Sequence, residues 1–296
     1  MRMSFRALAA VALLIPATAA EAQYRLDKVA DGVYLAVPAS PAPNAANIPV
    51  IVTDQDVVLV ASHLAPAPAR ALIEQVKTIT DRPVRFIVNT HYHGSQAGSR
   101  EPYPAGVEVI GHELARRTLL FDQAGHPRPA DAMMVPPTIG MTTRLSLYRG
   151  EREVRILYVG RGHSDTDLVV LLPKEHILCS GELLTALLPD MSDGFVSDWA
   201  STLESMKLLD FDTVLPARGP SLKGKDKIAA LQSYLRDALN QTTELLNKGT
   251  SVAEVARRVD LTAHKKDFPE IQGPGIDVNA VRRMQSQIEE EPSWEP

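Results

Sequence analysis

The sequence predicts a mixed α/β fold in which two β-sheets pack face to face and helices cover their outer sides. A series of short apolar, strand-like segments followed by an amphipathic helix occurs twice along the chain, in the same order. The 296 residues are 45% hydrophobic and 23% charged, a composition that can bury a sizeable core. The chain is therefore expected to be an ordinary globular protein.

The first half alternates strands and helices up to about residue 122. Apolar, β-branched runs separated by turn-like residues predict the strands, and apolar residues on one face predict the helices. Pro83 opens the strand that leads to His91. The expected elements are strands at 32–37, 49–53, 57–60, 83–89 and 107–110, and helices at 68–80 and 112–122.

The second half repeats this order and then becomes helical. Strands are expected at 154–159, 168–172, 177–179 and 213–215, with a helix at 199–209 before the last of them. Beyond Pro220, amphipathic patterns predict helices at 226–247, 252–259 and 278–289. We expect one domain over residues 23–221, and a helical extension of the same domain over residues 222–296.

The N-terminus resembles a secretory signal peptide. Arg2 and Arg6 precede a short apolar run, and Ala20-Glu21-Ala22 supplies a small-x-small cleavage pattern, so we expect cleavage after Ala22. A retained membrane anchor is the alternative, but the apolar run is shorter than the roughly 20 residues that a spanning helix needs, and Pro16 interrupts it. Residues 1–22 thus predict a periplasmic or secreted protein.

Charge and cysteine content narrow the classes of partner. Cleavage would remove two arginines and one glutamate, which changes the formal net charge from −5 to −6. With this net negative charge we expect no basic surface that would bind nucleic acid. We also expect no membrane association after cleavage. Cys179, the single cysteine, cannot form an internal disulfide and is expected to be a small buried hydrophobic residue.

A histidine pair follows the strand that ends at Asn89. The stretch Asn89-Thr90-His91-Tyr92-His93-Gly94 resembles the metallo-β-lactamase-fold hydrolases, whose loop normally reads His-x-His-x-Asp-His and holds two zinc ions. Here Ser95 and Gln96 occupy the last two positions. The resemblance covers roughly residues 30–220 and implies an αββα sandwich.

Further motifs follow in the order that the resemblance implies. Gly162-His163-Ser164-Asp165 resembles the motif whose histidine is the third ligand of the first zinc. Glu182 stands where an aspartate normally bridges both metals, and Arg218 occupies the histidine position of the final Gly-His-Gly motif. The segment Asp198-Trp199 matches the helix between these two motifs.

The resemblance divides these residues between two metal sites. His91, His93 and His163 form the three-nitrogen set of a catalytic zinc with its fourth position open to water. The second site is degenerate, because Arg218 places a permanent cation where a dication would bind. Its residues are Ser95, Gln96, Glu182 and Arg218. We therefore expect one zinc per chain, and a salt bridge between Arg218 and Glu182 that fills the vacated site is an alternative role for that pair.

Four other histidines are expected to be structural. His112, His126 and His176 lie outside the motifs, and a lone histidine is more often a hydrogen-bonded scaffold residue than a metal ligand. His63 follows a strand end where the family commonly has an aspartate that orients a ligand, so it is the better candidate among these four.

The leading hypothesis is a hydrolase that acts on an ester, lactone or amide bond of a small molecule through one zinc. Glu182 or Asp165 is the candidate general base, and Arg218 is a candidate to bind a substrate carboxylate or stabilise an oxyanion. The alternative is a non-catalytic relative that binds a small ligand or partner.

The segment 124–139, which contains Met133-Met134, is either an apolar flap over the pocket or a long connection. Lactams, thioesters, phosphoesters and sulfate esters stay open as substrates, and the oligomeric state is not predicted.

Overall fold

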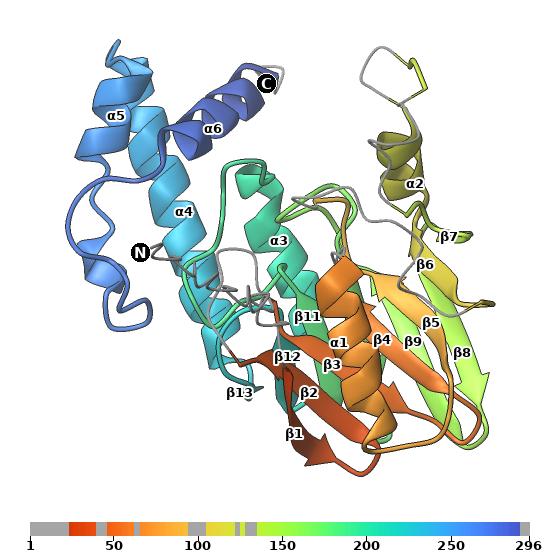
Figure 1. The fold of residues 1–296 in the computed structure, drawn as a ribbon. Coiled ribbons are helices and arrows are strands. Elements are labelled where there is room, and N and C mark those ends of the chain that lie inside the picture. The colour runs from red at the N-terminus through yellow and green to blue at the C-terminus, as the bar shows by residue number, and fades with distance from the viewer. Residues whose placement is uncertain are drawn as a thin grey trace, which may run out of the picture.

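The computed structural model describes residues 24–39, 46–61, 66–93, 105–121, 125–127 and 135–290. The expected signal peptide, Met133-Met134 and three candidate site residues, namely His63, Ser95 and Gln96, lie outside these ranges. The described chain forms two β-sheets with helices on their outer sides (Figure 1).

The first sheet has seven strands in the order β1-β2-β3-β4-β5-β6-β7. The first four strands pair antiparallel, and β4, β5, β6 and β7 pair parallel. Their bounds are β1 Tyr24–Ala30, β2 Val33–Pro38, β3 Ile48–Val52, β4 Val57–Ala61, β5 Val84–Asn89, β6 Glu108–His112 and β7 Ile139–Met141. The parallel strands β4 and β5 bring their carboxyl ends to one edge of the sheet, where binding loops are commonly placed.

The second sheet has six strands in the order β13-β12-β11-β10-β9-β8. All neighbours pair antiparallel except β11 and β12, which are parallel. The bounds are β8 Arg144–Arg149, β9 Arg152–Tyr158, β10 Leu168–Leu172, β11 Ile177–Gly181, β12 Thr213–Pro216 and β13 Leu222–Lys223.

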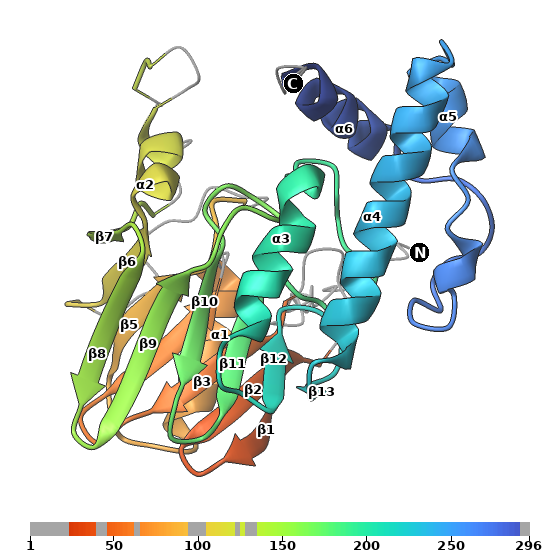
Figure 2. The same ribbon diagram turned by 180° about the vertical axis from the view of Figure 1, so that it is seen from behind.

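The helices lie outside the two sheets. The α-helices are α1 Pro66–Lys77, α2 Glu113–Leu120, α3 Val196–Lys207, α4 Asp226–Asn247, α5 Val252–Arg258 and α6 Val278–Glu290, and a short 3₁₀ helix covers Thr262–His264. Among the residues that the structure describes, no helix combines the length and the apolar character needed to cross a membrane. Figure 2 shows α3 and α4 against the second sheet, with α5 and α6 at one end of α4 and α2 at the opposite side of the molecule.

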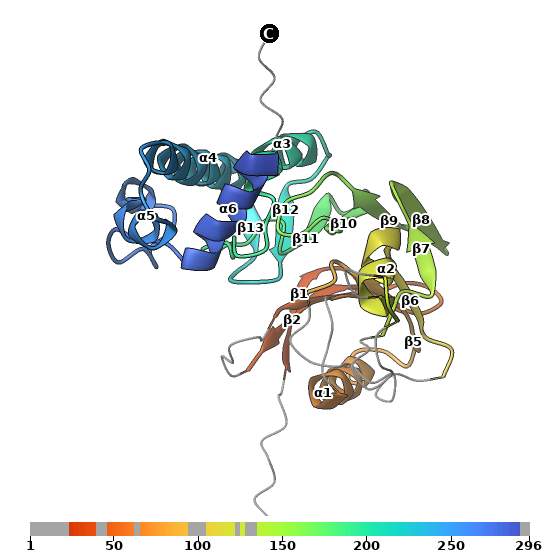
Figure 3. The ribbon, with the colours of Figure 1, turned by 90° about the horizontal axis from the view of Figure 1, so that it is seen from above.

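Three hydrophobic clusters define four layers. Val58, Val88 and Val170 belong to the cluster between the sheets, whereas Leu72 of α1 belongs to the cluster on the outer face of the first sheet. The outer face of the second sheet shares a cluster with the helices that follow it, including Trp199 of α3. The αββα arrangement expected from the sequence is thus present, and the view in Figure 3 shows its layers.

The buried face of each strand follows from the sequence pattern. β10 reads Leu-Val-Val-Leu-Leu and is buried throughout, because one face meets the first sheet and the other meets the helices. β8 has no fully buried residue, since Arg144 and Tyr148 are exposed and the other residues are half-buried. Its apolar pattern is correspondingly weak, and the sequence did not predict it; β1, β7 and β13 were missed as well.

Most predicted boundaries are confirmed within a few residues. The range predicted for α4 agrees with the structure, while α3 begins at Val196 and not at Trp199. The earlier start follows from the backbone, since the amides of Asp198 and Trp199 donate to the carbonyl of Phe195 at 3.0 and 2.9 Å. The C-terminal helices contribute Leu235, Val255 and Met284 to the same cluster as the second sheet.

Candidate metal centre

His91 and His93 lie directly beyond the carboxyl end of β5. The preceding residue, Thr90, accepts a hydrogen bond from the backbone amide of Leu168 at 2.7 Å. This bond joins the first residue of β10 in the second sheet to the histidine segment of the first sheet. Gly181, with φ +58°, packs against Thr90, and a Cβ there would lie 3.1 Å from the Thr90 Cβ. Close packing therefore fixes where the histidine segment leaves the sheet.

His163 lies in the loop between β9 and β10, and that loop is held by local hydrogen bonds. Asp167 accepts from the Ser164 amide at 2.8 Å and from the Ser164 hydroxyl at 2.9 Å. Gly162 leaves no room for a side chain, since a Cβ there would lie 2.4 Å from Leu183 Cδ1 and 2.9 Å from Trp199 Cδ1. The loop that carries His163 is thus pressed against the core of the second sheet.

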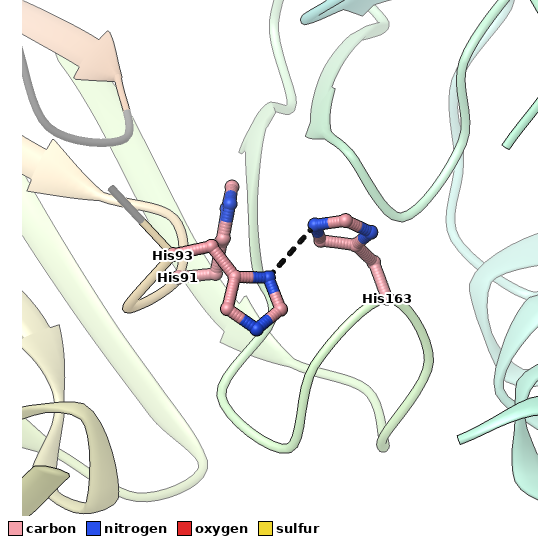
Figure 4. A group of neighbouring side chains, drawn as sticks. All are labelled: His91, His93 and His163. Carbon is pink, nitrogen blue, oxygen red and sulfur yellow. Dashed lines mark hydrogen bonds between the residues drawn. The ribbon is translucent and has the colours of Figure 1, made fainter. Parts of the chain in front are cut away.

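The three imidazoles converge on one point (Figure 4). One ligating nitrogen from each of His91, His93 and His163 lies within 4.8 Å of the other two. His93 Nδ1 lies 3.0 Å from His163 Nε2. Within the described ranges, this is the one group of three or more histidine, cysteine or acidic residues with the spacing of a metal site. The structure therefore brings together the three residues that the sequence singled out.

The nitrogens that face away from the centre have neighbours of their own. His163 Nδ1 lies 3.2 Å from the Asp190 carbonyl oxygen, an acceptor, so this nitrogen carries the proton and Nε2 presents its lone pair. His91 Nδ1 lies 3.1 Å from the Thr90 hydroxyl. His93 Nε2 lies 3.4 Å from Asp193 Oδ2. The 3.4 Å approach to His93 is not a hydrogen bond. Outer hydrogen bonds such as that of His163 fix the tautomer and the orientation of metal-binding imidazoles.

Burial keeps two of these rings neutral. Desolvation, followed by the proximity of His163, lowers the pKa of His93 to about 4. Desolvation also lowers the pKa of His163, with the Asp190 carbonyl opposing the shift. The neutral imidazole is the form that binds a metal.

The donor set fits a divalent metal ion. Two ligands at roughly 2.0–2.1 Å on a tetrahedral ion are about 3.3 Å apart, close to the 3.0 Å between His93 Nδ1 and His163 Nε2. Imidazole nitrogens suit zinc and other borderline metals. The rings are mutually perpendicular to within about 15°, so they approach the centre from different directions.

Glu182 and Arg218 form an ion pair at the carboxyl ends of β11 and β12. Arg218 Nε donates to Glu182 Oε1 at 3.1 Å; the Glu182 side chain is 9% exposed and that of Arg218 38%. Burial raises the pKa of Glu182, and the charge of Arg218 opposes that shift. The salt bridge considered from the sequence is therefore present.

Asp165 follows His163 by two residues and has a different environment. Its Oδ1 atom is buried and has no hydrogen-bond partner among the described residues. Its negative charge acts to raise the pKa of His93 against the larger effect of burial. Asp165 thus offers an acceptor atom without a described partner in the loop that carries His163.

Three further described histidines, His112, His126 and His176, lie outside this cluster. His112 accepts from the Leu114 amide at 3.2 Å and so caps α2. His176 pairs with Asp210 at 3.3 Å. His126 is exposed. None of these three belongs to the described metal cluster.

The sequence did not single out Asp190 and Asp193. Both lie in the loop between β11 and α3, which belongs to neither histidine motif. From there Asp190 contacts His163 and Asp193 approaches His93. The only available signal was the polar stretch Pro189-Asp190-Met191-Ser192-Asp193-Gly194 before a helix, which is common to many loops.

The fold and the site together define a class of metal-binding proteins, in which three histidines lie at the edge of an αββα sandwich. Comparison with known protein families identifies the family to which this chain belongs. The family model described as "Metallo-beta-lactamase superfamily" matches residues 42–218, which is more than half of the chain. The chain belongs to this superfamily. The match ends at Arg218 and so leaves α4, α5 and α6 outside it.

Individual relatives are distant. The chain is 26% identical over 177 residues to a metallo-beta-lactamase type 2 from a Bacillus species (strain 170), and 25% identical to one from Bacillus cereus; both matches cover 57% of this chain. The chain spans 65% of the length of these two proteins. A linear primary-alkylsulfatase from a Pseudomonas species is 22% identical over 247 residues, which are 66% of this chain and 46% of that protein.

Solved structures support the fold. A metallo-beta-lactamase from Pontibacter korlensis superposes with a TM-score of 0.62 at 21% identity, covering 72% of this chain and 99% of that one. The metallo-beta-lactamase FIM-1 from Pseudomonas aeruginosa, in its mono-zinc form, gives a TM-score of 0.61 at 17% identity, covering 74% of this chain and 97% of that one.

Proposed function

We propose that the protein is a hydrolase that uses one zinc ion, held by His91, His93 and His163, to cleave an ester, lactone or amide bond of a small molecule. The observation that carries this proposal is the convergence of three imidazole nitrogens within 4.8 Å of one another. Membership of the superfamily supports it. When bound, zinc in a three-nitrogen set supplies Lewis acidity, which activates water and polarises a scissile carbonyl.

We assign a single metal because Arg218 and Glu182 stand at positions that the sequence resemblance matches to ligands of a second ion, and the two residues pair with each other. Arg218 and Glu182 neutralise each other at 3.1 Å, and a fixed guanidinium there opposes a nearby dication. The FIM-1 structure described as a mono-zinc form is a similar fold that holds one zinc. In this proposal Ser95 and Gln96 complete the loss of the second site.

The chain's own residues hold the reacting groups in place. The hydrogen bond from His163 to the Asp190 carbonyl orients that ring, and Asp193 Oδ2 lies 3.4 Å from His93 Nε2. Of the two candidate bases, we favour Asp165 over Glu182, because Glu182 is engaged by Arg218 whereas Asp165 Oδ1 lacks a partner among the described residues. The partly exposed guanidinium of Arg218 is placed to bind a substrate carboxylate or oxyanion.

The Arg218–Glu182 pair also supports a second candidate, a non-catalytic relative that binds a small ligand. Zinc analysis of the purified mature protein, together with a hydrolysis screen of esters, lactones and lactams, separates the two. The hydrolase hypothesis predicts that the purified protein contains zinc and hydrolyses at least one of these substrate classes. A protein that binds ligands without zinc would support the alternative. We further propose export through residues 1–22, so that the mature protein is periplasmic or secreted.

A further inference from the structure

The C-terminal helix α6 holds the loop that contacts the histidine cluster. The backbone carbonyl of Gly194 accepts from Gln287 Nε2 at 2.6 Å and from Arg283 Nε at 3.2 Å. The Gln287 side chain is buried, and its Oε1 also lies 3.5 Å from the amide of Ser197 at the start of α3. Two polar groups of α6 thus converge on one carbonyl of the loop between β11 and α3.

Gly194 lies between a residue that approaches His93 and a residue that bonds to the loop of His163. The residue before it, Asp193, is 3.4 Å from His93 Nε2. The residue after it, Phe195, donates its amide to the Gly162 carbonyl at 2.7 Å, directly before His163. A Cβ on Gly194 would lie 3.2 Å from Trp199 Cζ3 and 3.3 Å from the Gly162 oxygen. The loop is therefore confined between α6 and the His163 loop.

Arg283 makes a second contact with the same loop. Its Cζ atom lies 4.4 Å from the centroid of the Phe195 ring, and the Cζ atom of Arg161 lies 4.6 Å from the same centroid. Cation–π and hydrogen-bond contacts together fix Phe195 and Gly194 relative to α6.

We propose that Arg283 and Gln287 are positioning residues of the metal centre, which hold Asp190 and Asp193 of the 190–194 loop against His163 and His93. This inference rests on the proposed function. Groups that orient metal-binding imidazoles typically affect metal affinity by about 10- to 100-fold. The helix beyond the family match is then part of the site.

Docking of α6 onto the domain does not depend on these two polar contacts. Ala280, Val281 and Met284 of α6 are buried in the cluster shared with α3 and α4. Loss of the Arg283 contacts should therefore release the loop while the helix stays in place. This separation makes the proposal testable in the folded, full-length protein.

The test compares zinc affinity in the full chain for Arg283→Ala, Gln287→Ala and Arg283→Lys, measured by competition with a chromophoric chelator. Arg282→Ala is the matched control, because Arg282 is an exposed neighbour whose side chain contacts Asn279. We expect each alanine variant to bind zinc about tenfold more weakly, with faster exchange of the Phe195 amide. Arg283→Lys keeps the charge but lacks the guanidinium donor, so we expect a loss of about threefold.

Zinc affinity and Phe195 exchange that match the parent in both alanine variants would overturn the proposal. So would an equal loss in Arg282→Ala. If the alanine variants fail to fold, the zinc affinity of Arg283→Lys is the deciding measurement. A zinc affinity equal to that of the parent would then contradict the positioning role of Arg283. A parent protein that binds no zinc contradicts the proposed function itself, whereas a parent that binds zinc with unaffected variants contradicts only the positioning role.

Discussion

His93 Nδ1 lies 3.0 Å from His163 Nε2, although 70 residues separate the two histidines along the chain. His93 follows β5 of the first sheet, and His163 precedes β10 of the second. Neither half of the sandwich holds the ligand set alone. The metal centre therefore depends on how the two sheets pack, and changes that move the His163 loop should weaken the site.

Gly162→Ala tests this dependence on packing. The new methyl group would meet Leu183 Cδ1 at 2.4 Å and Trp199 Cδ1 at 2.9 Å, so the His163 loop or the core must move. We expect a loss of about 1–3 kcal/mol in the free energy of unfolding, together with weaker zinc binding. Chemical denaturation and zinc titration measure the two effects.

Gly273→Ala is the control for that change, since nothing lies within 4 Å of its added Cβ. We expect parental stability and zinc binding in this variant. If Gly162→Ala matches Gly273→Ala in both measurements, the His163 loop is not held as described.

The Arg218–Glu182 pair predicts a pH-dependent stability. Burial raises the pKa of Glu182 above its ordinary value of 4.5, so its protonated form favours folding. The contribution of Glu182 to the free energy of unfolding is complete at pH values below its ordinary pKa. It is lost as the pH rises through the raised pKa of the folded state. Arg218→Met removes the opposing cation and should steepen this loss. We expect about 1–2 kcal/mol of destabilisation near pH 8 and little near pH 4, with the magnitude discounted because Arg218 is partly exposed.

Urea denaturation at both pH values measures this effect. The control is the double variant Glu182→Gln with Arg218→Met, which carries no ionisable group at this pair and should lose the added pH dependence. An equal destabilisation of Arg218→Met at both pH values would show that the charge of Glu182 is not responsible.

Asp165→Asn tests the assignment of the general base. Loss of an essential base should lower kcat by about 100-fold or more, with zinc content unchanged because Asp165 is not in the ligand set. Glu182→Gln should have the smaller effect on kcat. The reverse order of effects would transfer the role to Glu182.

The layers were predictable because strong local patterns encode them, and the ligand set was predictable because its motifs resemble those of the metallo-β-lactamase fold. β10 is a continuous apolar segment and the run that ends at Asn89 is largely apolar. His91 and His93 follow β5 closely, and His163 precedes β10 in the same loop. The αββα layers follow from two repeats of that order. The ion pair of Glu182 and Arg218 could likewise be predicted, because two opposite charges occupied positions that were expected to lie close together.

The contacts around the ligands were not predictable in the same way. Asp190 and Asp193 reach the histidines through the tertiary placement of a polar loop, and no periodicity marks them. Arg283 and Gln287 lie about 90 residues beyond Gly194, with which they bond, on a helix whose polar residues alone do not indicate their partner. Strands such as β8 were missed because their pattern is only half apolar.

Rebuilding the second site tests why it is absent. The combined change Ser95→Asp, Gln96→His and Arg218→His restores one carboxylate and two imidazoles, and it removes the cation that pairs with Glu182. We expect the triple variant to take up a second zinc, whereas Arg218→His alone should not, because it leaves too few ligands. Zinc per chain in a folded triple variant equal to that of the parent would mean that the loops are no longer arranged for two metals.

The most direct test of the one-metal centre is zinc per chain in the purified protein and in His93→Ala and His163→Ala, with His176→Asn as the control outside the cluster. We predict one zinc in the parent and in the control, and none in the two alanine variants, since two remaining imidazoles rarely hold zinc against solvent. Two tightly bound zinc ions in the parent, or one retained in both alanine variants, would contradict a single centre formed by His91, His93 and His163.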